Sequence, residues 1–230
     1  MKTKLLTLSV ILVLSTIAMQ AQIGFGLLGG VNFQNINGKE SNGDKLENGL
    51  LAGFHAGVNA NIPVAPDFYF QPGLLFSVKG AKNNFLNISV KASDDDYNTT
   101  TKISYIEIPL SFLYRPQVGN GHILLGFGPY VAFGVGGSQK FESGTRAYEQ
   151  KIAFSNEITE SEFFDLENAY FRRFDAGANI FFGYEIPMGV FLQLNAQLGM
   201  LKINPAHTWD TGDETSYKNT GFGLSIGYRF

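Results

Sequence analysis

The sequence predicts an all-β protein, an eight-stranded antiparallel up-and-down transmembrane β-barrel with short turns at one end and long loops at the other. Three observations predict this fold. Apolar and polar residues alternate with period two over eight stretches, each of about ten residues or more, the length that a tilted strand needs to cross a bilayer. Short connections containing Pro or Gly alternate in strict order with long polar ones. The polar positions within the stretches are mainly Gly, Asn, Gln and Ser, with few Lys or Glu.

The amino-terminal segment reads as an export signal. Residues 1–4 are short and basic, residues 5–19 form an apolar run, and Ala21 supplies a small residue at a cleavage point. The run is 15 residues long, shorter than the about 20 that a spanning helix needs. We therefore expect a signal peptide over residues 1–21 and one β-barrel domain over residues 22–230.

The strands are defined by their alternation. The clearest stretch is residues 190–200, in which apolar residues at Leu192, Leu194 and Leu198 are separated by Gln193 and Asn195. The predicted strands cover residues 24–34, 49–62, 67–79, 103–115, 122–136, 172–186, 190–200 and 221–230.

The connections predict which end of the barrel is which. Pro and Gly end strand pairing and fold the chain back at residues 63–66, 116–121 and 187–189. The other connections, residues 35–48, 80–102, 137–171 and 204–219, are longer and polar. With an even number of strands, all short turns and both chain ends meet at one rim, an asymmetry typical of outer-membrane barrels with short periplasmic turns and long extracellular loops.

The residue types on the two faces decide which face points outward. A soluble barrel keeps its apolar face inside and a charged face in water. Here the non-apolar face consists mainly of small residues and carries many glycines, which suit a narrow lumen. Aromatic residues gather near the strand ends, as in the girdles of membrane barrels. We expect the apolar face to contact outer-membrane lipids, with a membrane girdle at the short-turn rim formed by Tyr114, Tyr184, Tyr228 and Phe230.

Several short stretches also resemble a known family. They are residues 105–110 (YIEIPL), 128–130 (GPY), 174–177 (FDAG) and the carboxy-terminal 227–230 (GYRF). Together with the signal segment they are similar to the PorT-like outer-membrane β-barrel proteins of Bacteroidetes, which are small porin-like barrels resembling OmpX, and the likeness covers essentially the whole mature chain. It implies integral location in the bacterial outer membrane and delivery to the barrel assembly machinery through the carboxy-terminal strand ending at Phe230. One relative serves in a secretion and gliding apparatus, which makes such an apparatus a candidate partner.

Charged residues on the non-apolar face are the first candidate site. With the apolar face in lipid, His55 and Lys79 point inward, together with a predicted lumen network of Glu107, Arg115, Arg173, Asp175, Glu185 and Arg229. An unpaired charge in a narrow interior costs several kcal/mol, so we expect opposite charges to pair structurally; a proton or ion relay is the alternative. Side chains fill an eight-stranded barrel, which argues against a diffusion pore.

A second candidate is a hydrolase or acyltransferase site in the fourth long loop. His207, Asp210, Asp213, Glu214 and Ser216 lie close together there, and nucleophilic catalysis needs a Ser within hydrogen-bond reach of a His oriented by an acid. No family motif surrounds them, and Trp209 beside them also suits a headgroup-level anchor. We predict that the protein is not an enzyme; a lipid-modifying enzyme is the alternative.

Two loop segments leave alternatives open. Asp94, Asp95 and Asp96 form an acidic run that we interpret as solvated, with Ca²⁺ binding as the alternative because the pattern lacks the Gly and Glu of an EF-hand. In residues 160–171, apolar residues recur near helical spacing, which indicates a short helix. Such a helix would either cap the barrel mouth or form a partner surface.

Composition excludes other classes of protein. Lys and Arg number 17 against 20 Asp and Glu, and removal of Lys2 and Lys4 leaves 15 against 20, a net charge of −5. This acidic balance does not suit nucleic acid. There is no cysteine, and no phosphate loop, dinucleotide fingerprint or zinc pattern occurs, so we predict no cofactor and no metal. The predicted function is structural or interactive, through the extracellular loops; a narrow channel or a secretion-apparatus component is a further alternative.

Overall fold

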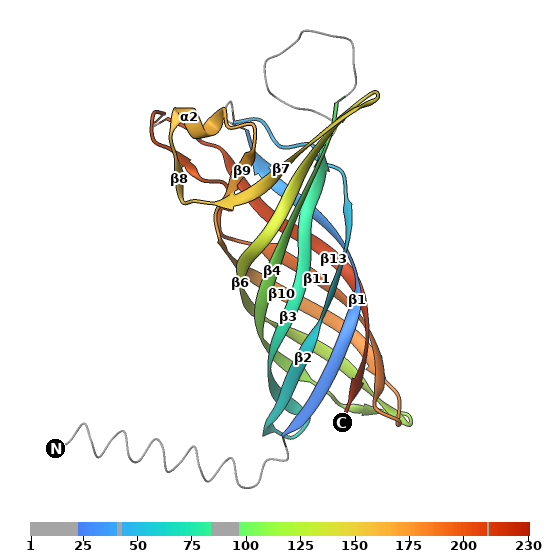
Figure 1. Ribbon diagram of the computed structural model, residues 1–230. Helices are drawn as coiled ribbons and strands as arrows, with labels where there is room; N and C mark the ends of the chain where they lie inside the picture. The colour runs from blue at the N-terminus through green and yellow to red at the C-terminus, as the bar shows by residue number, and fades with distance from the viewer. Residues whose placement is uncertain (1–22, 41–42, 84–96, 211) are drawn as a thin grey trace, which may run out of the picture.

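A computed structural model describes residues 23–40, 43–83, 97–210 and 212–230. The expected signal peptide and the acidic run at Asp94 lie outside these residues. Eight strands form a closed antiparallel ring, because β13 pairs with β1 and β6 pairs with β10 (Figure 1). The ring strands are β1 (Gly24–Lys39), β2 (Leu51–Ala65), β3 (Phe68–Asn83), β4 (Tyr97–Tyr114), β6 (Gly121–Ser143), β10 (Phe174–Glu185), β11 (Val190–Gly199) and β13 (Ser216–Arg229). The predicted eight-stranded up-and-down barrel is confirmed.

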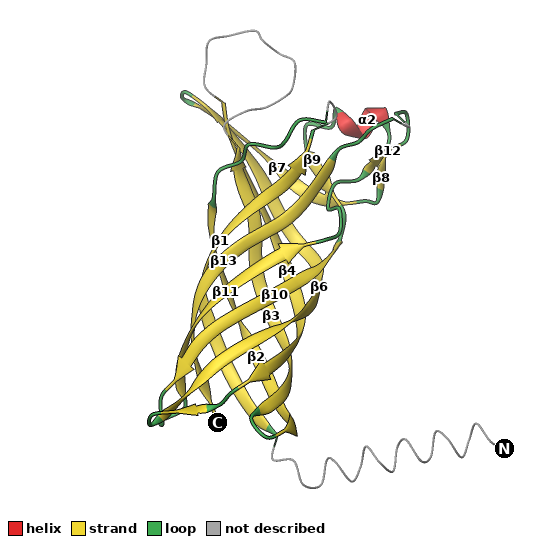
Figure 2. Ribbon diagram, turned by 180° about the vertical axis from the view of Figure 1, so that it is seen from behind, coloured by secondary structure: helices red, strands yellow, loops and turns green. Residues whose placement is uncertain are grey.

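Among the described residues, six short elements lie at the two rims of the barrel, outside the ring of eight strands. They are β5 (Gln117–Val118), β7 (Arg146–Phe154), β8 (Glu157–Ile158), α2 (Glu160–Phe163), β9 (Asn168–Phe171) and β12 (Ala206–His207). Figure 2 shows α2, β8 and β12 at one end of the cylinder and the carboxy terminus at the other. Within the described ranges, no helix has the length and apolar character needed to cross a bilayer.

The apolar face of the sheet points outward. Along β11, Leu192, Leu194 and Leu198 are 52%, 59% and 57% exposed, whereas Phe191 and Gly199 are buried and Gln193 lines the interior. Adjacent residues of a strand face opposite sides of the sheet, so the alternation in the sequence becomes an apolar exterior and a polar lumen.

The three short turns each contain one residue in the left-handed backbone region. Asp67 (φ 62°) joins β2 to β3, Gly119 (φ 64°) lies between β5 and β6, and Gly189 (φ 83°) joins β10 to β11. Gly adopts this conformation without steric cost, and Asp tolerates it better than most residues. These turns therefore reverse the chain within a few residues, as the sequence predicts.

The strands extend farther on the loop side than the alternation indicated. β6 continues to Ser143, where the predicted strand ended at residue 136, and it pairs there with both β4 and β7. β1 likewise runs to Lys39, paired with Ser216 of β13. The barrel wall thus projects well beyond the stretch with an apolar exterior.

The expected helix in the third long loop is present but only four residues long. Thr159 begins it with a capping box, in which its side chain accepts from the Glu162 amide and the Glu162 carboxylate accepts from the Thr159 amide. Asp165 then accepts hydrogen bonds from the amides of Glu167 and Asn168 and from the Tyr170 hydroxyl. These bonds stabilise a turn that leads into β9, so the helical spacing does not continue.

The lumen holds two apolar clusters, one toward each rim. On the loop side, Ile152, Ala169, Phe171 and Ile203 from the loops pack against residues of the barrel wall. Toward the turn side, Leu113, Leu124 and Phe191 pack together. The long loops therefore contribute to closing the mouth of the barrel with buried side chains.

Candidate functional site

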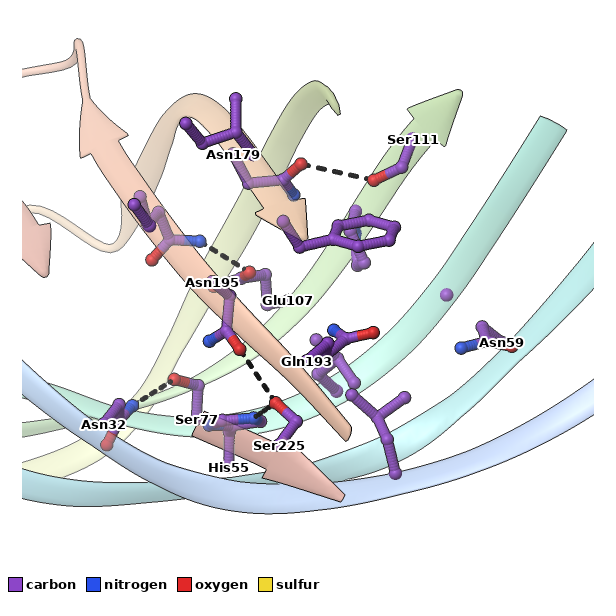
Figure 3. Close-up of a pocket in the computed structure, with 18 of the residues that line it drawn as sticks. Asn32, His55, Asn59, Ser77, Glu107, Ser111, Asn179, Gln193, Asn195 and Ser225 are labelled. Atoms are coloured by element: carbon purple, nitrogen blue, oxygen red, sulfur yellow. Dashed lines mark hydrogen bonds between the residues drawn. The ribbon is translucent and has the colours of Figure 1, made fainter. Parts of the chain in front are cut away.

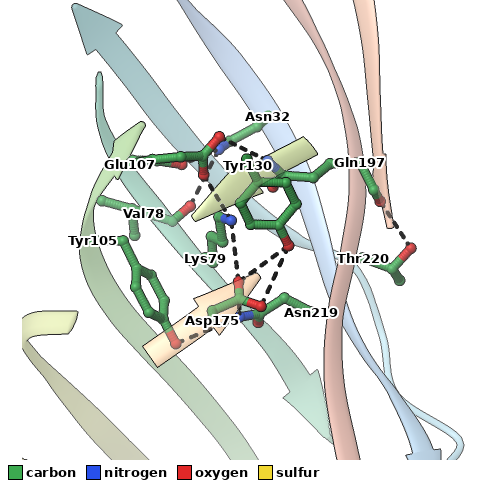
Figure 4. Close-up of polar contacts among 11 residues, drawn as sticks. Asn32, Val78, Lys79, Tyr105, Glu107, Tyr130, Asp175, Gln197, Asn219 and Thr220 are labelled. Atoms are coloured by element: carbon green, nitrogen blue, oxygen red, sulfur yellow. Dashed lines mark hydrogen bonds and ion pairs between the residues drawn. The ribbon is translucent and has the colours of Figure 1, made fainter. Parts of the chain in front are cut away.

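A buried ion cluster fills the lumen on the loop side. Lys79 of β3 lies 2.7 Å from Glu107 of β4 and 3.2 Å from Asp175 of β10, and the three residues are 0%, 4% and 1% exposed. We call Lys79, Glu107 and Asp175 the loop-side cluster (Figure 4). Buried charges persist only when they are paired and hydrogen-bonded, and all three meet that condition here.

Uncharged side chains complete the loop-side cluster. The hydroxyl of Tyr130 and the amide of Asn219 donate to Asp175 at 3.2 Å and 3.0 Å, and Gln197 donates to Glu107 at 2.7 Å. The Lys79 ammonium also lies 4.1 Å from the centre of the Tyr130 ring, within the range of a cation–π interaction. Side chains from several strands thus converge on one cation.

Three of the four stretches that carry the family resemblance meet at this cluster, and the fourth, residues 227–230, lies at the turn-side rim. Tyr105 and Glu107 come from residues 105–110, Tyr130 from residues 128–130 and Asp175 from residues 174–177. Tyr105 accepts a hydrogen bond from Asn219 (3.4 Å) and is fully buried. The sequence indicated the charged members of the cluster. It did not indicate Tyr105 and Tyr130, because aromatic residues were expected on the lipid face, or Asn219, because residues 204–219 were predicted to be a loop.

A second ion cluster lies where the strands end at the short turns. The Nε atoms of Arg115 and Arg229 donate to the same oxygen of Glu185, at 3.2 Å and 2.8 Å. We call these three residues the turn-side cluster. Its formal composition is two cations and one carboxylate, the inverse of the loop-side cluster, which has one cation and two carboxylates.

A chamber of about 90 Å³, lined by both polar and apolar side chains, extends from Glu107 toward the turn side, and Figure 3 shows several of its polar residues. His55 Nε2 lies 2.7 Å from the Ser225 hydroxyl, which donates to Asn195 at 2.9 Å. Ser111 donates to Asn179 at 3.2 Å across the same space. The volume accommodates a few water molecules, which amide and hydroxyl groups of this kind bind well.

Arg173 is a correction to the predicted lumen network. It precedes β10, which begins at Phe174, and it lies in a bend where the alternation of the strand does not apply. Its side chain is exposed, and its guanidinium carbon lies 5.1 Å from the ring centre of Phe133 and 4.8 Å from that of Phe154. The other five residues of the predicted network belong to the two clusters.

The predicted girdle residues lie on the outer surface near the short turns. Tyr114, Tyr184, Tyr228 and Phe230 are all exposed. Tyr114 stacks on Phe68 with ring centres 4.5 Å apart, and the Tyr184 hydroxyl donates to the carbonyl of Val118 at 3.0 Å. Their contact with membrane lipids stays a prediction.

At the mouth, the third and fourth long loops are joined. β8 and β12 pair in parallel, and the Thr208 hydroxyl donates to the carbonyl of Ile158 at 3.1 Å. His207 Nδ1 lies 3.1 Å from Asp213 Oδ2, and the His207 ring stacks on Trp209 with centres 4.7 Å apart. The two loops therefore form one ordered layer rather than independent segments.

The predicted nucleophile does not join this His–Asp pair. Thr215, not Ser216, contacts Asp213, through its amide at 2.9 Å and through its hydroxyl. Ser216 begins β13 in register with Lys39, and no hydrogen bond links it to His207 within the described part of the chain. Asp210 and Glu214 are exposed. The described ranges also contain no group of three or more His, Asp or Glu residues arranged to hold a metal ion.

Low pH is expected to destabilise the fourth long loop by protonating Asp213. Partial burial favours its neutral form, but hydrogen bonds from Thr215 and the nearby His207 outweigh this effect and hold the pKa of Asp213 below its ordinary value. The ionised Asp213 carboxylate therefore stabilises the folded loop at pH values above its unfolded-state pKa of about 3.9. This stabilisation is lost as the pH falls through the lower pKa of the folded state. We expect a change in Trp209 fluorescence below about pH 4. Asp213→Asn should remove that transition; its persistence would contradict this assignment.

Comparison with known proteins places the chain in a family. A family profile described as outer membrane protein beta-barrel domain matches residues 19–204. Similar solved structures include Ail, the attachment invasion locus protein of Yersinia pestis, with 13% identity over 90% of this chain and 99% of that chain (TM-score 0.37). Neisserial surface protein A has 12% identity over 90% of this chain and 97% of that chain (TM-score 0.41). A major outer membrane protein from Thermus thermophilus has 12% identity over 90% of this chain and 99% of that chain (TM-score 0.45).

At these identities, the likeness to solved structures concerns the fold alone. Comparison with curated proteins finds no match. The profile covers well over half of the chain and agrees with the closed ring of strands and its apolar exterior. The chain belongs to the outer membrane protein β-barrel domain family, and it is a β-barrel protein of the outer membrane.

Proposed function

We propose that this protein is a non-enzymatic, non-conducting barrel that presents its third and fourth long loops to a partner at the cell surface. The observation that carries the proposal is the ordered layer at the mouth, in which β8 pairs with β12 and His207 with Asp213. Beneath that layer, the lumen contains two buried ion clusters and two apolar clusters. Groups available to other molecules are therefore concentrated on the loops.

We further propose the route by which the protein reaches this position. Residues 1–21 direct export and are removed, and the carboxy-terminal strand with Phe230 engages the barrel assembly machinery. The motifs that meet at Lys79 support assignment to the PorT-like group of Bacteroidetes, in which a secretion or gliding apparatus is one candidate partner. The exposed apolar exterior supports contact with outer-membrane lipids.

Site-specific photocrosslinking in intact cells tests the surface role. A photoreactive residue at Leu166, which is 73% exposed on the third loop, should give protein adducts. The same residue at Phe127, which is 62% exposed on the barrel exterior, is the control and should give lipid adducts. An absence of protein adducts at Leu166 would contradict the proposal.

Two measurements test the alternative functions. The purified barrel in planar bilayers should show no discrete conductance steps, because charged and apolar side chains occupy the lumen. Mass spectrometry of lipopolysaccharide should give the same acyl pattern for the natural chain and for His207→Ala or Ser216→Ala. Regular conductance steps would favour a channel, and an acyl pattern that depends on Ser216 would favour a lipid-modifying enzyme.

A further inference from the structure

The joined loops expose an aromatic surface, which we call the rim platform: Phe163, Phe164, Leu166, His207 and Trp209. Phe163, Phe164 and Leu166 are 51%, 67% and 73% exposed, and Trp209 is 40% exposed. The ring of Phe163 packs edge-on against Phe164 at 5.3 Å and against Trp209 at 5.6 Å. Exposed apolar patches that polar residues surround are typical of interaction sites, and Trp is enriched among the residues that dominate binding energy.

The segment of residues 160–171 in the third long loop has two halves with different surroundings. Its carboxy-terminal residues Ala169 and Phe171 are buried in the apolar cluster at the mouth, so they cap the lumen. Its amino-terminal residues Phe163 and Phe164 remain exposed beside Trp209 of the other loop. Cap and partner surface, the two readings left open by the sequence, are thus assigned to different halves of one segment.

The two loop segments that form the rim platform carry charges of one sign, apart from His207; Lys202, which precedes the second segment, interacts electrostatically with Asp213. Residues 157–167 contain five carboxylates and residues 206–214 contain three, and neither range contains Lys or Arg. Glu162, Asp165 and Asp213 are engaged by Thr159, Asn168 and Thr215. Across the described chain, no Lys or Arg forms an ion pair with the remaining carboxylates, which are Glu157, Glu160, Glu167, Asp210 and Glu214.

We propose that the rim platform binds a cationic segment of a partner protein that also carries an apolar anchor. This rests on the proposed surface function and names its partner class. The apolar side chain packs on Phe163 and Phe164, and Lys or Arg side chains of the segment pair with Asp210 and Glu214 or lie over the Trp209 ring. Like-charge repulsion disfavours the alternative occupant, the anionic phosphates of lipopolysaccharide.

The chain supplies its own reporter for this binding. Trp209 is the only tryptophan, so tryptophan emission of the full barrel in nonionic detergent, excited at wavelengths that tyrosine does not absorb, reports on the rim platform. The probes are three capped octapeptides without tryptophan, which alternate Lys with Leu, Glu with Leu, or Lys with Ser. The Lys–Leu peptide should shift the emission saturably and bind about tenfold more tightly than either other peptide, with affinity falling as salt is added.

Matched variants separate the charge from the apolar anchor. Asp210→Asn combined with Glu214→Gln should weaken the Lys–Leu peptide about tenfold, and Phe163→Ser combined with Leu166→Ser should do the same. Glu142→Gln is the control, since Glu142 lies outside the rim platform and pairs with Lys140; it should leave the affinity unchanged. Each variant is shown to fold when its heated and unheated samples differ in gel mobility as those of the natural chain do.

Three outcomes would overturn the proposal. The first is that the Glu–Leu peptide binds as tightly as the Lys–Leu peptide. The second is that the Asp210 and Glu214 double variant keeps full affinity for the Lys–Leu peptide. The third is that purified lipopolysaccharide shifts the Trp209 emission and the Lys–Leu peptide does not. Any of these would refute the cationic partner class, while protein adducts at Leu166 would still support a surface role. Failure of the proposed function itself is recognised separately, by the absence of those adducts.

Discussion

Lys79→Met is expected to lower the free energy of unfolding by about 3–5 kcal/mol. The substitution removes the cation that both Glu107 and Asp175 contact, and it leaves two carboxylates facing each other at 4% and 1% exposure. Removing one partner from a buried ion cluster leaves a desolvated charge without compensation. Urea unfolding of the barrel in detergent, followed by far-ultraviolet circular dichroism, measures the loss.

A surface ion pair of the same chain provides the matched control. Lys140 and Glu142 are 46% and 48% exposed, so Lys140→Met should cost less than about 1 kcal/mol. Combining Lys79→Met with Glu107→Gln and Asp175→Asn should restore much of the lost stability, because no buried charge then remains uncompensated. Equal losses for Lys79→Met and Lys140→Met would show that the loop-side cluster contributes no more than a surface pair.

Gly177→Ala is expected to destabilise the barrel by about 1–3 kcal/mol or more. A Cβ atom at Gly177 would lie 2.1 Å from the carbonyl oxygen of Leu198 and 2.8 Å from Cα of Gly199 on the neighbouring strand. Both atoms belong to the backbone of β11, so relief of the clash must separate β10 from β11 locally. Thermal unfolding, monitored by the gel mobility of the barrel, measures the effect.

Gly136→Ala is the corresponding control. Gly136 is also a strand residue, but a Cβ atom there would have no neighbour within 4 Å. The exchange should leave the thermal midpoint nearly unchanged or raise it slightly, since Gly in a strand contributes no side chain to packing. Similar midpoints for the two variants would mean that the close approach of β10 and β11 tolerates a methyl group.

The parts of the fold that cross the membrane could be predicted from the sequence because two environments act on them. Along β11, the outward positions hold Leu192, Leu194 and Leu198 and the lumen positions hold Gln193 and Asn195, so period-two alternation is strong. The loop-side extensions of β4 and β6 face water on at least one side. Their sequences, such as Thr99–Thr101 and Ser138–Lys140, carry no such contrast, and the strands were predicted too short.

The candidate sites were predictable only in part, for a related physical reason. Alternation indicated that Glu107 and Asp175 share the lumen, but it gave no information on which strands face each other across it. It also failed at Arg173, where the chain bends before β10 begins. The rim platform depends on the pairing of β8 with β12, a contact between segments about fifty residues apart that leaves no local pattern.

The opposite formal charges of the two ion clusters have a consequence for permeation along the barrel axis. A cation that entered from the loops would be attracted by the surplus carboxylate near Lys79, but it would next be repelled by the surplus guanidinium beside Glu185. An anion entering from the same side would be repelled at the first of these positions. Two electrostatic barriers of opposite sign thus act in series, one against each sign of ion, which is the behaviour expected of the proposed non-conducting barrel.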